Sequence, residues 1–95
     1  MDEKYKLLIS ELGENRVKKN ADVTEFLQTK LGGLASFSYI ATSEKELINV
    51  ILICHELKIN FLIIGSGSKI AIGSNGFLGL VIKNIFIWSF FIVLL

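Results

Sequence analysis

A chain of 95 residues can form one domain and is too short for two large lobes. The formal net charge is +1, and no basic run is interleaved with aromatic residues, so a nucleic acid partner is not expected. The single cysteine excludes an internal disulfide and fits a reducing compartment. The charged first residues lack the apolar core of a signal peptide. Together these two features predict a cytoplasmic protein.

The chain begins with an amphipathic pattern. Residues 2–12 carry apolar side chains at i, i+3, i+4 and i+7, which predicts a helix, and Gly13 follows as its C-cap. The apolar positions are Tyr5, Leu8, Ile9 and Leu12. Residues 14–29 are mostly polar and are typical of a solvated linker. The sequence therefore predicts an N-terminal helix and linker over residues 1–29.

A strand, a capped helix and a second strand follow. Aromatic residues alternate with serines over residues 36–40, which predicts a strand. Ser43 and Glu46 form a capping box, in which Ser43 caps the third helical N–H and Glu46 reaches back to the backbone N–H of Ser43. The helix runs to about Leu57, and the short apolar run at 61–64 predicts a buried strand. The two strands of this βαβ unit are expected to be parallel.

The predicted helix after Ser43 has a wide apolar face. One stripe consists of Leu47, Val50, Ile51, Cys54 and Leu57. Ile48, Leu52 and Ile53 widen this stripe, which predicts burial on more than one side. Cys54 and His55 have no acidic or thiol partner at ligand spacing, so we interpret Cys54 as a core residue and His55 as lying at the core's edge. No metal site is expected.

The residues after the 61–64 strand carry the main functional signal. Glycines accept positive φ, so successive backbone N–H groups can converge on a phosphate, and serine hydroxyls add donors. Lys69 could add a point charge, although a plain strand-to-strand turn with a solvated lysine is the alternative. The candidate residues for binding a phosphorylated cofactor are Ile64, Gly65, Ser66, Gly67, Ser68 and Lys69. We call residues 65–69 the cradle.

The spacing of the cradle excludes two common phosphate motifs. The dinucleotide fingerprint GxGxxG would need a glycine where Ile70 stands, and no acidic residue follows to hold a ribose. A P-loop needs serine or threonine after its lysine, and Ile70 occupies that place too. Residues 70–72 and 78–82 then predict two short strands around a turn at 73–76. The whole order, α, β, α, β, β, β, predicts an α/β (α+β) fold.

The order and spacing of these features resemble the N-terminal FAD-binding segment of the UDP-N-acetylenolpyruvoylglucosamine reductases, also called UDP-N-acetylmuramate dehydrogenases. That family carries Gly-Gly-Gly-Ser-Asn at the cradle and Gly-Phe-x-Gly-x-Val-Ile after it, where this chain has residues 65–69 and 76–82. Residues 16–20, Arg-Val-Lys-Lys-Asn, also match the family, which implies an extended stretch near the flavin instead of a linker. The chain departs from the family at Leu34, which replaces a proline.

The resemblance implies an incomplete FAD-binding domain of the vanillyl-alcohol-oxidase type over residues 30–84. It implies a flavoenzyme of peptidoglycan synthesis, hence of cell wall biogenesis and cell shape, in which FAD passes a hydride from NADPH to UDP-N-acetylglucosamine enolpyruvate and gives UDP-N-acetylmuramate. The family's catalytic arginine, serine and glutamate belong to later parts of the enzyme. The resemblance therefore implies FAD binding by the cradle and no catalytic residue in this chain.

The last residues, 85–95, form an apolar run without charge. Spanning a bilayer takes about 20 apolar residues, so a span is disfavoured, although attachment of a small non-enzymatic protein to a membrane through this run stays an alternative. A generic FAD-binding module is a further alternative. The abrupt change of composition after Asn84 is typical of a truncated gene or broken reading frame, an expectation that the DNA past codon 84 tests.

Overall fold

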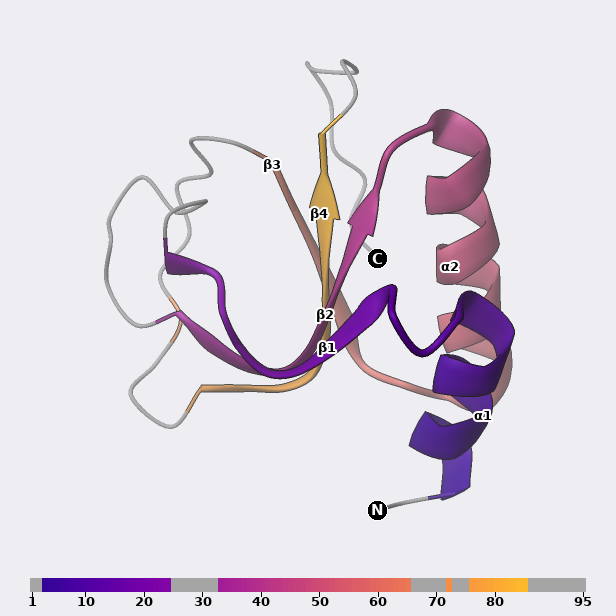
Figure 1. Ribbon diagram of the computed structural model, residues 1–95, viewed down its shortest axis with the longest axis horizontal. Helices are drawn as coiled ribbons and strands as arrows, with labels where there is room; N and C mark the ends of the chain where they lie inside the picture. The colour runs from indigo at the N-terminus through magenta and orange to yellow at the C-terminus, as the bar shows by residue number, and fades with distance from the viewer. Residues whose placement is uncertain (1–2, 25–32, 66–71, 73–75, 86–95) are drawn as a thin grey trace.

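The computed structural model describes residues 3–24, 33–65, 72 and 76–85, and it shows two helices and four strands (Figure 1). In chain order these are α1 (Glu3–Leu12), β1 (Val17–Asp22), β2 (Leu34–Ala41), α2 (Glu44–Leu57), β3 (Phe61–Gly65) and β4 (Phe77–Asn84). The α/β class, the two helices and the strands at residues 36–40, 61–64 and 78–82 are confirmed, each within a few residues of the predicted bounds.

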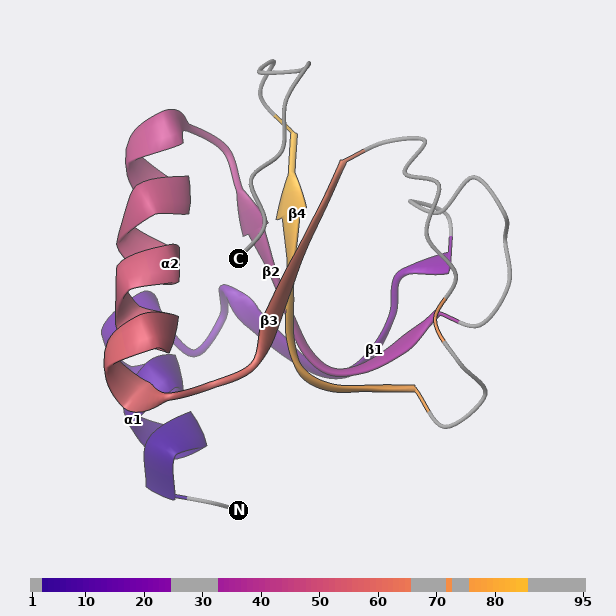
Figure 2. The ribbon, with the colours of Figure 1, turned by 180° about the vertical axis from the view of Figure 1, so that it is seen from behind.

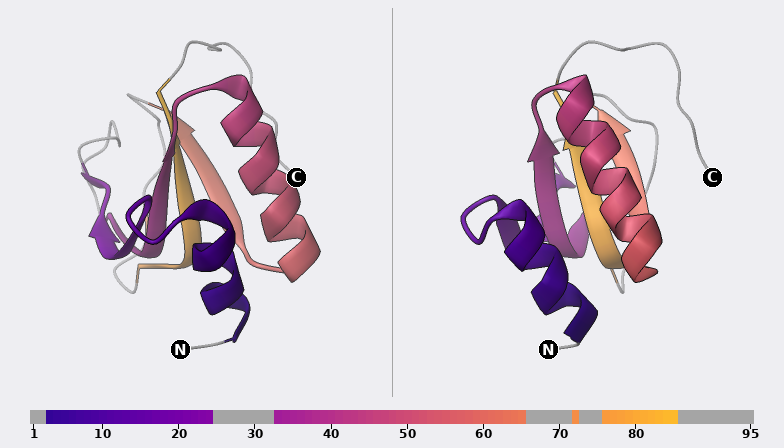
Figure 3. Two further views of the ribbon diagram at one scale, coloured as in Figure 1. Left: turned by 45° about the vertical axis from the view of Figure 1, so that its right-hand side comes forward. Right: turned by 90° about the vertical axis from the view of Figure 1, so that its right-hand side faces the viewer.

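The strands form one sheet with the order β1-β2-β4-β3. β1 is antiparallel to β2, whereas β2 and β3 are both parallel to β4, which lies between them. The predicted parallel arrangement of β2 and β3 is thus confirmed, although the two strands are not neighbours. Both helices cover the same face of the sheet, and Figures 1 and 3 show them side by side on it. We call the other side, on which the described residues place no helix, the helix-free face.

The two faces of the sheet have separate hydrophobic clusters. On the helix side, Leu8 of α1 and Val50 of α2 pack with alternate residues of the strands, such as Tyr39 and Ile82. On the helix-free face, a smaller cluster holds Val23, Ala35, Ile64, Ile72 and Val81. Ile72 lies between β3 and β4 in the chain and packs in this cluster, so it lies on the helix-free face, which is to the right of the sheet in Figure 2. The predicted strand at 70–72 is wrong at Ile72, and residues 70–71 lie outside the described residues.

The segment after α1 contains a strand that the polarity of the sequence did not predict. Gly13 ends α1 with φ 102° and donates its N–H to Ile9, as expected of a C-cap. Val17 to Asp22 then pair with β2 instead of forming a solvated linker, which agrees with the extended stretch that the family resemblance implied. Only two of the six β1 residues are buried. Because β1 is an edge strand, its exposed lysines are compatible with pairing on one side.

The start of α2 differs from the predicted capping box in one contact. The Ser43 hydroxyl accepts the Glu46 N–H at 3.2 Å, as predicted. The Glu46 carboxylate does not return to Ser43. It accepts the backbone N–H and the hydroxyl of Thr42, each at 2.9 Å, and both Nη atoms of Arg16, each at 3.1 Å. Arg16 also donates to the Ile40 carbonyl at 2.9 Å, so one side chain ties the start of β1 to β2 and α2.

The prediction that α2 is buried on more than one side is wrong. Leu47, Val50 and Cys54 are buried against the sheet, and Ile51, Ile53 and Leu57 are partly buried. Ile48 and Leu52 are 48% and 61% exposed. These two residues lie one turn apart on the outer side of α2, where nothing among the described residues covers them.

Replacing Glu46 by glutamine tests the network at the start of α2. Hydrogen bonds from Arg16, the largest cause, and from Thr42 lower the pKa of Glu46 to about 2, from an ordinary value of 4.5. The Arg16 and Glu46 side chains are 39% and 31% exposed, so solvent weakens their attraction. We therefore expect Glu46→Gln to lower the free energy of unfolding at neutral pH by about 1 kcal/mol.

The pH dependence follows from the direction of that shift. Because the pKa is lower in the folded chain, the stabilisation is complete above about 4.5 and is lost as the pH falls towards about 2. Urea unfolding of both proteins across this range should show their stabilities converging at the acidic end. A constant difference at every pH would contradict the assignment of the effect to this carboxylate.

Candidate functional site

The candidate site lies at one edge of the sheet, where three parallel strands end together. β2 ends at Ala41, β3 at Gly65 and β4 at Asn84, and Gly65 pairs with Asn84. In open α/β sheets, ligands bind outside the carboxyl ends of the strands. Ile64 and Gly65 are the candidate residues that the structure describes, and they occupy the last two positions of β3. Ser66, Gly67, Ser68 and Lys69 lie outside the described residues, so their contacts with a ligand stay predictions.

Ile64 and Gly65 differ in what surrounds them. The Ile64 side chain is 1% exposed and belongs to the cluster on the helix-free face, so it is a core residue next to the candidate site. Gly65 is half-buried and does not have a left-handed backbone. Of the residues that the structure describes, a Cβ added to it would meet only the Asn84 carbonyl oxygen, at an ordinary 3.8 Å. Among the described atoms, nothing therefore requires glycine at this position, and none of them fills the space beside it.

The glycines of the Gly-Phe-x-Gly sequence have structural reasons of their own. Gly76 has φ 82° and lies against the Leu34 carbonyl. Gly79 has φ 151°, and a Cβ there would overlap the carbonyl of Asn60, which accepts the Leu80 N–H at 3.0 Å. The pairing of β4 with β2 shifts register at this point, and Figure 1 shows the strand bending sharply near its start. The glycines of this sequence thus allow β4 to bend and to approach Asn60, which precedes β3, closely.

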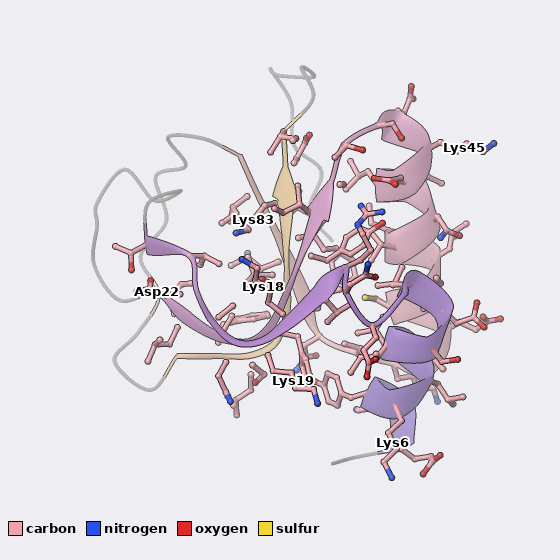
Figure 4. The ribbon with its side chains drawn as sticks, in the orientation of Figure 1. Lys6, Lys18, Lys19, Asp22, Lys45 and Lys83 are labelled. Atoms are coloured by element: carbon pink, nitrogen blue, oxygen red, sulfur yellow. The ribbon has the colours of Figure 1, made fainter. Side chains whose placement is uncertain are left out.

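Two positive side chains that the sequence did not single out lie on the helix-free face. Lys83 is in β4, beside Ile64, and is only 7% exposed. Lys18 is in β1, opposite Ser38, and is exposed. Figure 4 shows both ammonium groups on the side of the sheet away from the helices. Lys83 could not be singled out from the sequence, because it follows the apolar run of β4 and looks like the residue that ends the strand.

A hollow of about 110 Å³ lies near Lys18. Its lining includes Lys18, the nearly buried Ser38 and Ile40 of β2, together with Asn15 and Arg16. Arg16 donates its hydrogen bonds to Glu46 and to the Ile40 carbonyl, whereas the Lys18 ammonium makes no hydrogen bond to another described residue. The hollow is too small for a nucleotide, and it adds polar donors to the same face as Lys83.

Cys54 and His55 lie as the sequence predicted, the thiol inside and the imidazole outside. Cys54 is fully buried in the helix-side cluster, and burial raises the pKa of its thiol to about 12. A thiol in that state is not a nucleophile. Among the described residues, no group of His, Cys, Asp and Glu side chains could hold a metal ion. Within the same part of the chain, no helix has the length and apolar character needed to cross a membrane, and residues 86–95 of the apolar run lie outside it.

Comparison with known proteins places these features in a sequence family. No family model matches the chain. It is 30% identical over 80 residues to the UDP-N-acetylenolpyruvoylglucosamine reductase of Clostridium botulinum and 35% identical over 80 residues to that of Clostridium beijerinckii, in each case 83% of this chain and 26% of the relative. The reductase of Clostridium perfringens is 30% identical over 79 residues. The chain is therefore a homologue of the UDP-N-acetylenolpyruvoylglucosamine reductases that matches about a quarter of their length.

Proposed function

We propose that this chain binds FAD at the carboxyl edge of its parallel strands and forms one wall of the flavin site of a cytoplasmic UDP-N-acetylenolpyruvoylglucosamine reductase. Backbone N–H groups of the cradle, residues 65–69, would hold the diphosphate. FAD would supply hydride transfer from NADPH to the enolpyruvyl group of the UDP-sugar. The chain's own part is to bind and orient the cofactor, and residues outside it would polarise and protonate the substrate.

The observation that carries this proposal is the position of Gly65. It stands last in β3, at the edge where β2, β3 and β4 all end, and the cradle sequence begins with it. The space beside it is open among the described atoms, so a phosphate could approach the backbone there. The names of the homologous reductases support the UDP-sugar substrate, and the family resemblance of the cradle implies FAD as the cofactor.

FAD binding by the full chain tests the proposal. Flavin fluorescence should be quenched when the protein is added to FAD, and ADP should compete, because the two share the diphosphate. Gly65→Ala should fold normally, since the added Cβ has room, and should weaken FAD binding about tenfold by keeping the phosphate away from the backbone. Riboflavin, which lacks phosphate, serves as the control ligand. Failure of the unmodified chain to bind FAD or ADP would overturn the proposal.

A further inference from the structure

The hollow beside Lys18 lies on the helix-free face, where β1 pairs with β2. Tyr39 belongs to the cluster under the helices, so its neighbours Ser38 and Ile40 point to the other side of β2. Lys18 pairs with Ser38 across the two strands and therefore shares its side, as Figure 4 also shows. All three residues line the hollow, whose volume of about 110 Å³ has room for several water molecules or one small ion.

Ser38 brings a hydroxyl group into the hollow from the interior of the sheet. The residue is 2% exposed, and its hydroxyl makes no hydrogen bond to another described residue. On the same strand and face, the Ser36 hydroxyl donates to the Phe77 carbonyl at 3.4 Å. Within the described part of the chain, every fully enclosed side-chain nitrogen or oxygen atom has a hydrogen-bond partner, so the Ser38 hydroxyl must open onto the hollow. A buried hydroxyl is normally paired, which indicates a partner inside the hollow.

The charged groups around the hollow favour an anion. Lys18 is exposed, and its ammonium makes no hydrogen bond to another described residue. Arg16 also lines the hollow, but its guanidinium group is bound to the Glu46 carboxylate, which largely cancels its charge. None of the described residues that line the hollow is acidic. Lys18 therefore gives the hollow a positive charge that no lining carboxylate neutralises.

Asn15 adds a polar group at the start of β1. Its exposed side chain lines the hollow, and its amide makes no hydrogen bond to another described residue. Two acidic residues occur in the same stretch of chain without lining the hollow. Glu14 is exposed before Asn15, and Asp22, at the other end of β1, accepts hydrogen bonds from Thr24. The hollow thus combines an ammonium, a hydroxyl and an amide group.

We propose that this hollow binds an oxyanion of the size of phosphate. The Lys18 ammonium supplies the charge, and the Ser38 hydroxyl and the Asn15 amide donate hydrogen bonds. Donors on several sides suit a tetrahedral ion, which carries an oxygen atom in each direction. A hydrogen bond from a charged donor is about twice as strong as one between neutral groups, so Lys18 contributes most. None of these residues belongs to the cradle, so the site is separate from the proposed FAD site and does not depend on it.

Titration of the full chain with inorganic phosphate, followed by NMR of the backbone amides, tests this proposal. We expect the Lys18 and Ser38 signals to shift and to saturate together, whereas sodium chloride at the same ionic strength should shift neither. Lys18→Met should weaken phosphate binding about fivefold, and Ser38→Ala about threefold. Lys19→Met is the matched control. Lys19 is exposed at the next position of β1, pairs with Phe37 of the helix-side cluster, and makes the same change in net charge when replaced.

The outcomes distinguish a built site from general attraction to positive charge. If Lys18→Met and Lys19→Met weaken phosphate binding equally, or if sodium chloride produces the same shifts, the proposal fails. Acetate should bind more weakly than phosphate, and equal or tighter binding of acetate would overturn the assignment to phosphate. Gly65→Ala should leave the shifts at Lys18 and Ser38 unchanged, which separates this hollow from the cradle. Circular dichroism checks that each variant is folded, and Lys18→Met, at an exposed position, keeps the test decisive should Ser38→Ala not fold.

Discussion

Alanine at position 79 should destabilise the chain more than any exposed substitution. The backbone of Gly79 has φ 151°, and an added Cβ would overlap the Asn60 carbonyl and press on the Phe77 ring. The Asn60 carbonyl cannot simply move away, because it accepts the Leu80 N–H where β4 meets the start of β3. The backbone strain and the overlap together should lower the free energy of unfolding by about 3 kcal/mol. Urea unfolding followed by circular dichroism measures this loss.

Gly65→Ala is the matched control for this experiment. Both glycines lie in parallel strands of the same sheet, but a Cβ at residue 65 would make one ordinary contact within the described part of the chain, and Gly65 has no left-handed backbone. Its unfolding midpoint should stay close to that of the unmodified chain. If the two alanine variants proved equally stable, the tight approach of β4 to Asn60 would be contradicted. The pair also separates a glycine needed for packing from one proposed to face a ligand.

The elements with a strong local pattern could be predicted from the sequence. α1 and α2 have apolar side chains at helical spacing and a recognisable cap, and β3 is a short apolar run between polar turns. β1 has no such pattern, because Val17 and Ala21 are its buried residues and the rest are polar. β1 forms a strand because it pairs with β2, which follows more than ten residues later in the chain, and a local sequence pattern does not encode such a pairing.

Long-range partners explain the errors at α2. The Ser43 cap was predictable because donor and acceptor are three residues apart. The partner of the Glu46 carboxylate was not, since Arg16 comes from 30 residues earlier and competes successfully with the local N–H of Ser43. Ile48 and Leu52 look like core residues in sequence, but α2 meets the sheet on one side only. Apolar character alone did not indicate which side that would be.

The candidate site was predictable only where it depends on a local pattern, and not where it depends on how the strands pair. The strand leading to Gly65 was foreseen, and the structure adds that three strands end together there. The burial of Lys83 could not be recognised from the sequence, because it results from the central place of β4 between β2 and β3. The glycines of Gly-Phe-x-Gly, associated with flavin binding through the family resemblance, have packing reasons in the fold. A sequence motif can therefore mark a cofactor domain while its residues stabilise the backbone.

Replacing Leu8 by alanine is the second change expected to have a large effect. Leu8 is fully buried in the cluster shared by α1, α2 and the sheet. It is the buried residue of α1, a helix of ten residues. Truncation of a buried leucine leaves a cavity and should lower the free energy of unfolding by about 3 kcal/mol. The neighbouring Leu7 is 48% exposed, so Leu7→Ala should change stability by less than about 0.5 kcal/mol.

This pair of leucines also tests whether α1 belongs to the same cooperative unit as the sheet. If it does, urea unfolding of Leu8→Ala should remain a single transition at a lower midpoint, with helix and tertiary signals lost together. Loss of helix signal alone at low urea would show that α1 separates from the sheet independently. The folded fraction of Leu8→Ala should keep the FAD affinity of the unmodified chain, because Leu8 packs on the helix side of the sheet and the proposed site lies at the carboxyl edge of the strands.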